Sequence, residues 1–139
     1  MRIRFSICLA LFATPALGWT VTHERDRMTD HTLTWASSSS GAATLLVGCL
    51  NGSVQPRLTF RERIGYGRPG VSFRFDDGPV VPRIAMVSDD GTTLYVWTGD
   101  YADAMAKLRK GRRLRVQLSQ TFYDFDLSAG EPLPPINCR

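Results

Sequence analysis

The segment 44–50 is apolar on both faces of an extended chain, and an Asn51-Gly52 pair follows it directly. A short apolar run that ends in a turn signal is typical of a buried central strand. Asn-Gly is a strong hairpin signal because both residues tolerate positive φ. The segment therefore predicts a hairpin in which residues 53–63 return as the partner strand. Pro56 cannot donate to a strand ladder, so it predicts an edge or a bulge at that point.

Alternation of apolar and polar residues continues through most of the remaining chain. In 71–76, for example, Val71, Phe73 and Phe75 alternate with polar side chains, which is the period of a half-buried strand. The run of small residues at 37–41 predicts a turn. The segments predicted as strands are 32–36, 44–50, 53–63, 71–76, 80–87, 92–98, 113–119 and 121–127.

One segment, at about residues 100–110, has helical spacing instead. Tyr101, Met105 and Leu108 recur at i, i+4 and i+7 and form one apolar stripe. Asp100 is expected to cap the helix, and Gly111 is expected to end it in the left-handed conformation. One helix among about eight strands predicts a mainly β fold, an antiparallel β-sandwich or a partly open barrel.

The N-terminus has the pattern of a secretory signal peptide. Arg2 and Arg4 precede a short apolar core, and small residues stand before Trp19. The apolar run is shorter than the roughly 20 residues of a membrane span, which disfavours the alternative of a transmembrane anchor. We therefore expect a signal peptide at 1–18, a single β-rich domain at 19–139, no transmembrane segment after cleavage, and a periplasmic or secreted location.

Cleavage after residue 18 would remove Cys8 and leave Cys49 and Cys138. Two cysteines in an exported chain usually form one disulfide, which here would close a loop of about 90 residues. In the loop-entropy model such a bond stabilises the fold by about 4–5 kcal/mol. The alternative is a redox pair, which normally has the close spacing of a C-x-x-C motif that this chain lacks.

Charge and motifs argue against several classes of function. Cleavage removes two arginines, so the formal net charge falls from +4 to +2, too low to indicate a nucleic-acid partner. We identified neither a nucleophile motif nor a phosphate-binding loop and expect neither a cofactor nor a metal. The metal-ligand types at 23–31 are interpreted as a polar loop, with a metal enzyme built on them as the alternative. Those residues are His23, Asp26, Asp30 and His31.

Basic and aromatic side chains are the candidates for an interaction surface. Alternation places most of the arginines on outward faces, where they could attract an anionic partner. Tyr95 and Trp97 face away from Leu94 and Val96, so they either pack under the helix or form an exposed aromatic platform. The predicted surface comprises Arg57, Arg61, Arg63, Arg113, Arg115, Tyr95 and Trp97.

Several of these features occur together in one known group of proteins. They include Trp19, the Leu-x-Val-x-Cys motif at 45–49, the Val-Ser-Phe-Arg-Phe-Asp strand at 71–76, a late helix before a basic strand, and Cys138. The arrangement resembles small periplasmic proteins of the VasI/TagO group, which accompany type VI secretion systems. The invasion-associated locus B proteins have a similar layout. The resemblance spans most of 19–138 and implies a bacterial periplasmic β-protein without a known catalytic site.

From these observations we expect an exported, non-enzymatic accessory or binding protein of the bacterial cell envelope, associated with a secretion system. Its partner would be a protein or an envelope polymer. The alternative function is inhibition of a hydrolase such as lysozyme, in which loops of a small disulfide-bonded β-protein plug a cleft.

Overall fold

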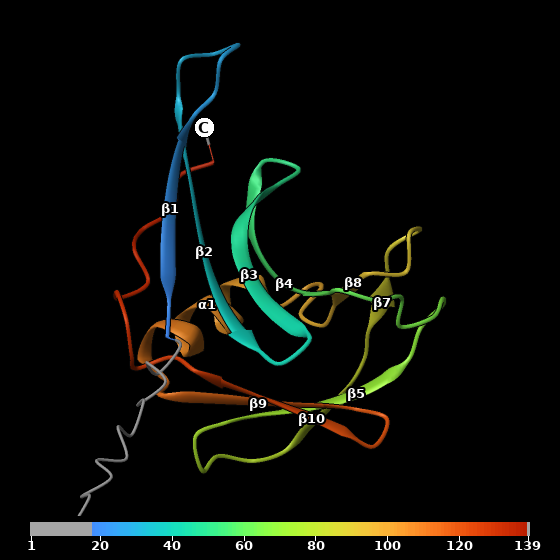
Figure 1. Cartoon of the computed structure of the whole chain (residues 1–139). Helices are drawn as coiled ribbons and strands as arrows, with labels where there is room; N and C mark the ends of the chain where they lie inside the picture. The colour runs from blue at the N-terminus through green and yellow to red at the C-terminus, as the bar shows by residue number, and fades with distance from the viewer. Residues whose placement is uncertain (1–17, 139) are drawn as a thin grey trace, which may run out of the picture.

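The computed structural model describes residues 18–138, which form two antiparallel β-sheets and one α-helix (Figure 1). The six-stranded sheet has the order β1-β2-β3-β4-β8-β7, with β1 at Thr20–Arg25, β2 at Thr32–Ser40, β3 at Ala43–Leu50, β4 at Ser53–Phe60, β8 at Thr93–Tyr95 and β7 at Met86–Val87. The four-stranded sheet has the order β10-β9-β5-β6, with β10 at Thr121–Asp126, β9 at Arg113–Leu118, β5 at Gly70–Phe75 and β6 at Val81–Ile84. The prediction of a mainly β, antiparallel sandwich with one short helix is confirmed. The predicted signal peptide falls almost entirely on residues 1–17, outside the described part of the chain.

The hydrophobic core lies between the two sheets, as the alternation predicts. Leu45, Leu58 and Leu94 from the six-stranded sheet are fully buried, and so are Leu114 and Phe125 from the four-stranded sheet. In Figure 1 the β1–β2 hairpin extends well beyond this core, away from the four-stranded sheet. The projecting half of the hairpin is therefore stabilised mainly by its own strand pairing.

The Asn51-Gly52 hairpin is confirmed, and its position explains how Pro56 is accommodated. Asn51 and Gly52 have φ of 51° and 79°, which is the left-handed region that a two-residue turn requires. Pro56 pairs with Val47 of β3, whereas β8 pairs with β4 only at Leu58 and Thr59. At Pro56 the strand therefore has a ladder partner on one side, which is the edge position that proline needs.

The serine run is not the turn that was predicted, because Ser37–Ser40 continue β2 and the turn lies after them. Two of the hydroxyl groups contact the other sheet. Ser38 Oγ donates to the carbonyl of Asp126 at 3.3 Å, and Ser40 Oγ accepts the N–H of Asp124 at 3.0 Å. These bonds satisfy two backbone groups on the free edge of β10, so the small polar side chains of β2 join the two sheets here.

Residues 80–87 were predicted as one strand, but the chain changes sheets within them. β6 pairs with β5 in the four-stranded sheet, and β7 pairs with β8 in the six-stranded sheet. Ala85 lies between them, fully buried, and its N–H donates to the carbonyl of Pro69 at 2.9 Å. The strand predicted at 92–98 is also shorter, since β8 ends at Tyr95.

Helix α1 spans Tyr101–Lys110 and buries Ala104, Met105 and Leu108, as its apolar stripe predicts. Both expected caps are wrong. The Asp100 side chain does not cap the helix but forms an ion pair with Arg83 of β6. Gly111 has φ of −71°, an extended conformation that any residue can adopt. The helix therefore ends because the chain enters β9, and not through a left-handed glycine.

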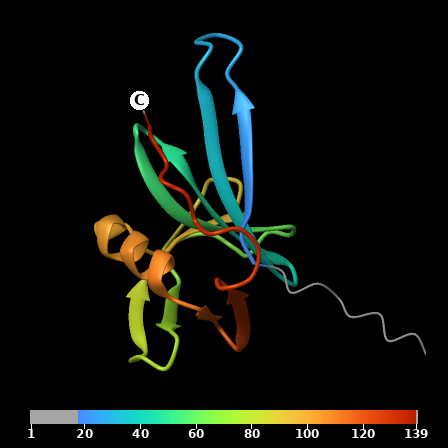
Figure 2. The same cartoon turned by 90° about the vertical axis from the view of Figure 1, so that its left-hand side faces the viewer.

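The C-terminal segment runs in extended form along the molecule and returns to β3, as Figure 2 shows in red. Gly130 bridges to Trp19, and a carboxylate oxygen of Glu131 accepts the N–H of Val21 at 3.0 Å. Cys138 is bonded to Cys49, with their Cα atoms 5.5 Å apart, which confirms the predicted disulfide. Within residues 18–138 no helix has the length and apolarity that a membrane crossing requires.

Candidate functional site

The outer face of the six-stranded sheet, which points away from the core, carries an apolar and aromatic surface. Alternation in β2 buries Ala36 and Ser38 and turns Leu33 and Trp35 outward. In β3 the same alternation turns Leu46 and Gly48 outward. Leu33 is 42% exposed and Trp35 is half-buried. This face is therefore not covered by another layer, although its side chains are of the kind found in binding sites.

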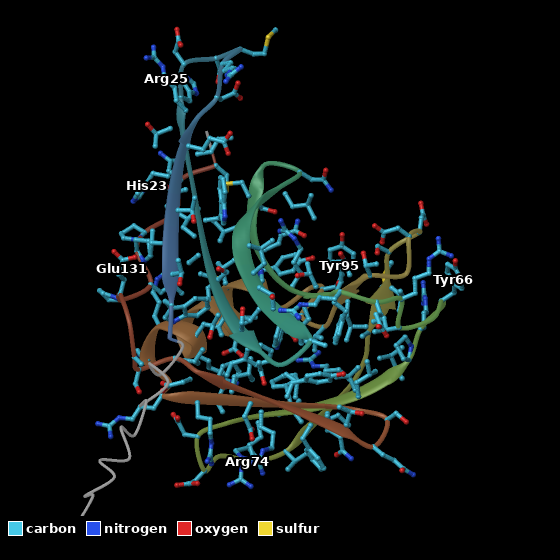
Figure 3. The ribbon with its side chains drawn as sticks, in the orientation of Figure 1. His23, Arg25, Tyr66, Arg74, Tyr95 and Glu131 are labelled. Carbon is cyan, nitrogen blue, oxygen red and sulfur yellow. A yellow bond between two sulfur atoms is a disulfide. The ribbon has the colours of Figure 1, made fainter. Side chains whose placement is uncertain are left out.

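The strand register arranges these side chains in two neighbouring rows. Leu46 of β3 pairs with Arg57 of β4, and the β4–β8 register, continued by one residue, places Tyr95 beside Arg57. The next row contains Trp35, Gly48 and Gln55, since Gly48 pairs with Gln55. Figure 3 shows Tyr95 on the side of β8 that faces away from the four-stranded sheet.

A cavity of about 280 Å³ opens between these rows, and we call it the Arg57 pocket. Gly48 lacks a side chain at its centre, and Gln55 leaves it free because its amide nitrogen donates to the carbonyl of Leu50 at 3.0 Å. The walls are mainly apolar. The pocket is lined by Leu33, Thr34 and Trp35 of β2, Leu46, Gly48 and Cys49 of β3, and Arg57 of β4.

The charge of Arg57 distinguishes this pocket from the rest of the surface. Four arginines within residues 18–138 are half-buried: Arg57, Arg74, Arg83 and Arg115. The last three each form an ion pair with an aspartate, namely Asp77, Asp100 and Asp124. Within the same residues Arg57 has no ion pair, and its guanidinium makes only a long contact of 3.4 Å with the carbonyl of Gln55.

No acidic residue occupies an outward position in β2, β3, β4 or β8. Glu24 of β1 lies opposite Leu33 on this face, but strands β2 and β3 separate it from Arg57. A partly desolvated guanidinium is most stable with an anionic partner. The Arg57 pocket therefore combines apolar walls with a positive charge that residues 18–138 leave without a carboxylate.

The structure separates the seven residues predicted for the interaction surface. Arg57 and Tyr95 lie together on the outer face of the six-stranded sheet. Arg61 and Arg63 are exposed in the loop after β4, where Arg63 donates to the hydroxyl of Tyr66 at 3.0 Å. Trp97 is only 1% exposed and packs edge-to-face on Phe73 in the core. Its assignment to the surface is therefore wrong, and the alternative that it packs inside is correct.

Arg113 and Arg115 lie on the outer face of the four-stranded sheet. Two nitrogens of Arg115 donate to the two carboxylate oxygens of Asp124 at 2.7 and 3.0 Å, and its guanidinium stacks over Phe122. The hydrogen bonds from Arg115 lower the pKa of Asp124, and those to Asp124 raise the pKa of Arg115. Arg74, which Figure 3 shows on this face, is paired as well. Arg115 is paired with Asp124, and Arg74 and Arg113 share Asp77, which makes this face the weaker candidate for anion binding.

The polar residues at 23–31 lie at the tip of the β1–β2 hairpin, where 23–25 end β1 and 26–31 form a tight turn. One oxygen of Asp26 accepts the N–H of Met28 at 2.7 Å, which lowers the pKa of this carboxyl group. Asp30 pairs with Arg25, and His23 Nδ1 bonds to the hydroxyl of Thr34 at 2.9 Å. Within residues 18–138 no three His, Cys, Asp or Glu side chains are grouped in a way that could hold a metal ion.

Comparison with known proteins places this chain in no family. A scan against protein-family models and searches of curated proteins and solved structures found no match. The function must therefore be argued from the geometry of the site itself.

Sequence reasoning identified Arg57 and Tyr95 but missed Leu33, Leu46 and Gly48 as parts of a site. Leu46 was interpreted as one side of a strand buried on both faces. Its face is instead half-buried and open. A glycine inside an apolar strand was the available signal, since it often marks a close approach of ligand or chain.

Proposed function

We propose that this protein is an exported, non-enzymatic accessory protein of the bacterial cell envelope that binds another protein through the outer face of its six-stranded sheet. The signal-peptide pattern at the N-terminus and the resemblance to the VasI/TagO group support export. A disulfide is the kind of crosslink that persists in an oxidising compartment such as the periplasm. The same resemblance makes type VI secretion machinery the first place to search for the partner.

The observation that carries this proposal is the Arg57 pocket and its surroundings. Leu33 is 42% exposed and Met86, opposite Tyr95 at the other end of the face, is 44% exposed. Exposed apolar side chains around an arginine are characteristic of protein–protein contacts, in which aromatic residues and arginine are enriched. A partner that covers this face would bury the apolar side chains and supply the anion for Arg57.

Site-specific photocrosslinking in cells tests the proposal. A photoreactive amino acid is placed at Leu33 or Tyr95 on the outer face, and at Ala102 on the exposed side of α1 as the control. We expect the first two positions to crosslink to the same envelope protein and Ala102 not to do so. Equal crosslinking at all three positions, or none at Leu33 and Tyr95, would contradict binding through this face.

Export is tested separately by measuring the mass of the protein from a periplasmic extract. Removal of residues 1–18 predicts a chain that begins at Trp19. A cytoplasmic protein with an intact N-terminus would contradict export without affecting the assignment of the binding face.

Inhibition of a hydrolase remains a second candidate function because of Tyr66. This side chain is 67% exposed at the far end of the molecule (Figure 3). Arg63 donates to its hydroxyl group, and the N–H of Ile64 donates to the carbonyl of Gly91 at 2.8 Å, so the loop is held in place. A held aromatic side chain on a loop is suited to entering a cleft. If this function is correct, the chain should inhibit lysozyme at micromolar concentration, and Tyr66→Ala should abolish the inhibition.

A further inference from the structure

We propose that the Arg57 pocket binds the C-terminal residue of a partner protein. The apolar side chain of that residue would lie over Gly48, against Trp35 and Leu46, and its α-carboxylate would bind Arg57. This inference rests on the proposed function, because it assigns the chemistry of the partner at the same face.

The size of the pocket argues for a small ligand group. Its volume of about 280 Å³ lies just below the roughly 300–1,000 Å³ of sites that enclose drug-sized molecules. A single residue fits this space better than a folded segment does. The hollow exists because Gly48 has no side chain, so one side chain from a partner can fill the row between Trp35 and Gln55.

The lining argues for a ligand that is apolar with one negative charge. Leu33, Trp35 and Leu46 supply hydrophobic walls, and Arg57 supplies the one charge. A guanidinium matches a carboxylate because its N–H groups can donate two parallel hydrogen bonds to the two oxygens. Each of the other three half-buried arginines lies within ion-pair distance of an aspartate, and Arg115 bonds to both carboxylate oxygens of Asp124, so a carboxylate on Arg57 would give it the kind of partner that they have.

The apolar walls of the pocket lie close to the charge of Arg57. This arrangement favours a C-terminal residue as the ligand over an acidic side chain within a chain. Arg57 and Leu46 are direct cross-strand partners, so the ligand must present its apolar and anionic groups within a few ångströms. A C-terminal apolar residue carries both groups on one Cα atom. In an extended internal segment, an apolar side chain and the acidic side chain next to it point to opposite faces.

A sugar of an envelope polymer fits the lining less well. Recognition of sugar hydroxyls needs several polar groups, but the only polar side chains in the lining besides Arg57 are Thr34, whose hydroxyl bonds to His23, and Cys49, which is in the disulfide. Thr34 alternates with the outward Leu33 and Trp35, so its side chain lies on the opposite face of β2. We accordingly assign the pocket to a protein terminus.

Fluorescence anisotropy with short labelled peptides tests the assignment on the purified, disulfide-bonded chain. The probe is a hexapeptide that ends in Leu-Phe with a free carboxylate, and its matched control is the same peptide with a C-terminal amide. We expect the amide to bind at least about tenfold more weakly, since it lacks the charge-assisted hydrogen bonds to Arg57. Intrinsic fluorescence gives a second readout, because Trp19 and Trp97 are buried and Trp35 is the tryptophan at the pocket.

Substitutions in and near the pocket test which residues cause the preference for the peptide acid over the amide. Arg57→Gln should bind the acid and the amide equally, whereas Arg61→Gln, which changes an exposed arginine beyond the end of the same strand, should keep the preference for the acid. Arg57→Lys should keep a weaker preference, because it retains the charge and loses the planar fork. Leu33→Ala should weaken both peptides about fivefold through the loss of an apolar wall. Thermal unfolding of each variant confirms that it is folded.

Three results would overturn the assignment. The first is equal binding of acid and amide by the unchanged protein. The second is an equal effect of Arg57→Gln and Arg61→Gln. The third is stronger binding of octanoate, free phenylalanine or a glucuronic acid disaccharide than of the peptide acid. If the peptides fail while Leu33 and Tyr95 still crosslink to an envelope protein, the proposed function survives and only the terminus assignment fails.

Discussion

The Cβ atom of Trp35 on β2 lies beside Gly48 on β3, so close that a Cβ added to the glycine would be 3.1 Å from it. Gly48 has an ordinary strand conformation and does not need the conformational freedom of glycine. The absence of a side chain at this position instead keeps the outer face of β3 open between β2 and β4. It leaves room for the Cβ atom of Trp35 on β2 and for the hollow that forms the Arg57 pocket.

Gly48→Ala should therefore change the pocket more than the fold. We expect the free energy of unfolding to fall by about 1 kcal/mol, the low end for overpacking, because a small movement of β2 relieves the contact with the Cβ atom of Trp35. The fluorescence spectrum of Trp35 should also change. Gly70→Ala is the matched control, since Gly70 is also in a strand and a Cβ there would meet nothing within 4 Å. Equal effects of the two substitutions would contradict the role of Gly48.

The Cys49–Cys138 disulfide should contribute strongly to stability because it closes a loop with a sequence separation of 89 residues. In the loop-entropy model Cys49→Ser and Cys138→Ser each lower the free energy of unfolding by about 4–5 kcal/mol, an upper estimate. The double variant should cost little more than either single variant, because the second change removes a bond that is already broken. Urea unfolding of the three variants measures this, and additive losses would contradict the bond.

Asp76, which directly follows β5, anchors the end of this strand to the junction between α1 and β9. One carboxylate oxygen accepts the N–H groups of Arg112 and Arg113 at 2.8 and 2.9 Å. Asp76→Ala should lower the free energy of unfolding by about 2 kcal/mol, because both donors lose their charged acceptor. Asp76→Asn should cost less, since it keeps an acceptor and tolerates the φ of 50° found here.

The adjacent Asp77 provides a matched control for Asp76. Its side chain is 95% exposed and makes only long ion pairs with Arg74 and Arg113, at 3.4 and 3.8 Å. Asp77→Ala should change the free energy of unfolding by less than about 0.5 kcal/mol, because solvent screens such contacts. Chemical unfolding of the Asp76 and Asp77 variants side by side would contradict the anchoring role if the two losses were equal.

The fold was largely predictable because its main signal is local. Alternation places Val71 and Phe73 in the core of β5, and the Asn51-Gly52 turn sets the β3–β4 hairpin. The errors arose where contacts between the two sheets determine where a strand ends. Ser38 and Ser40 extend β2 because their hydroxyls bond to β10, a strand about 85 residues further along the chain that local composition does not reveal.

The candidate site was less predictable for the same reason. Arg57 was one of several outward arginines in the sequence, and only the pairing of β4 with β3 and β8 shows that it lacks a carboxylate neighbour. Trp97 was assigned to a surface by extending the alternation of β8 past Tyr95. The strand ends there, and both Val96 and Trp97 turn into the core as the chain approaches α1. Alternation predicts faces only while the strand continues.

Acid should destabilise the fold partly through Asp124. The hydrogen bonds from Arg115, and then its charge, lower the pKa of this carboxyl group below its usual range. A carboxyl whose pKa is lower in the folded state stabilises the fold above its unfolded pKa, and this contribution is lost as the pH falls through the folded pKa. Asp124→Asn should therefore be less stable than the unchanged chain at neutral pH, and the difference should shrink as the pH falls below about 4.

Urea unfolding at neutral pH and at about pH 2.5 measures both differences. Glu62→Gln is the control, because the exposed Glu62 makes no hydrogen bond or ion pair through its carboxylate within residues 18–138. A difference for Asp124→Asn that stays constant with pH would show that the Arg115 pair does not contribute to acid sensitivity.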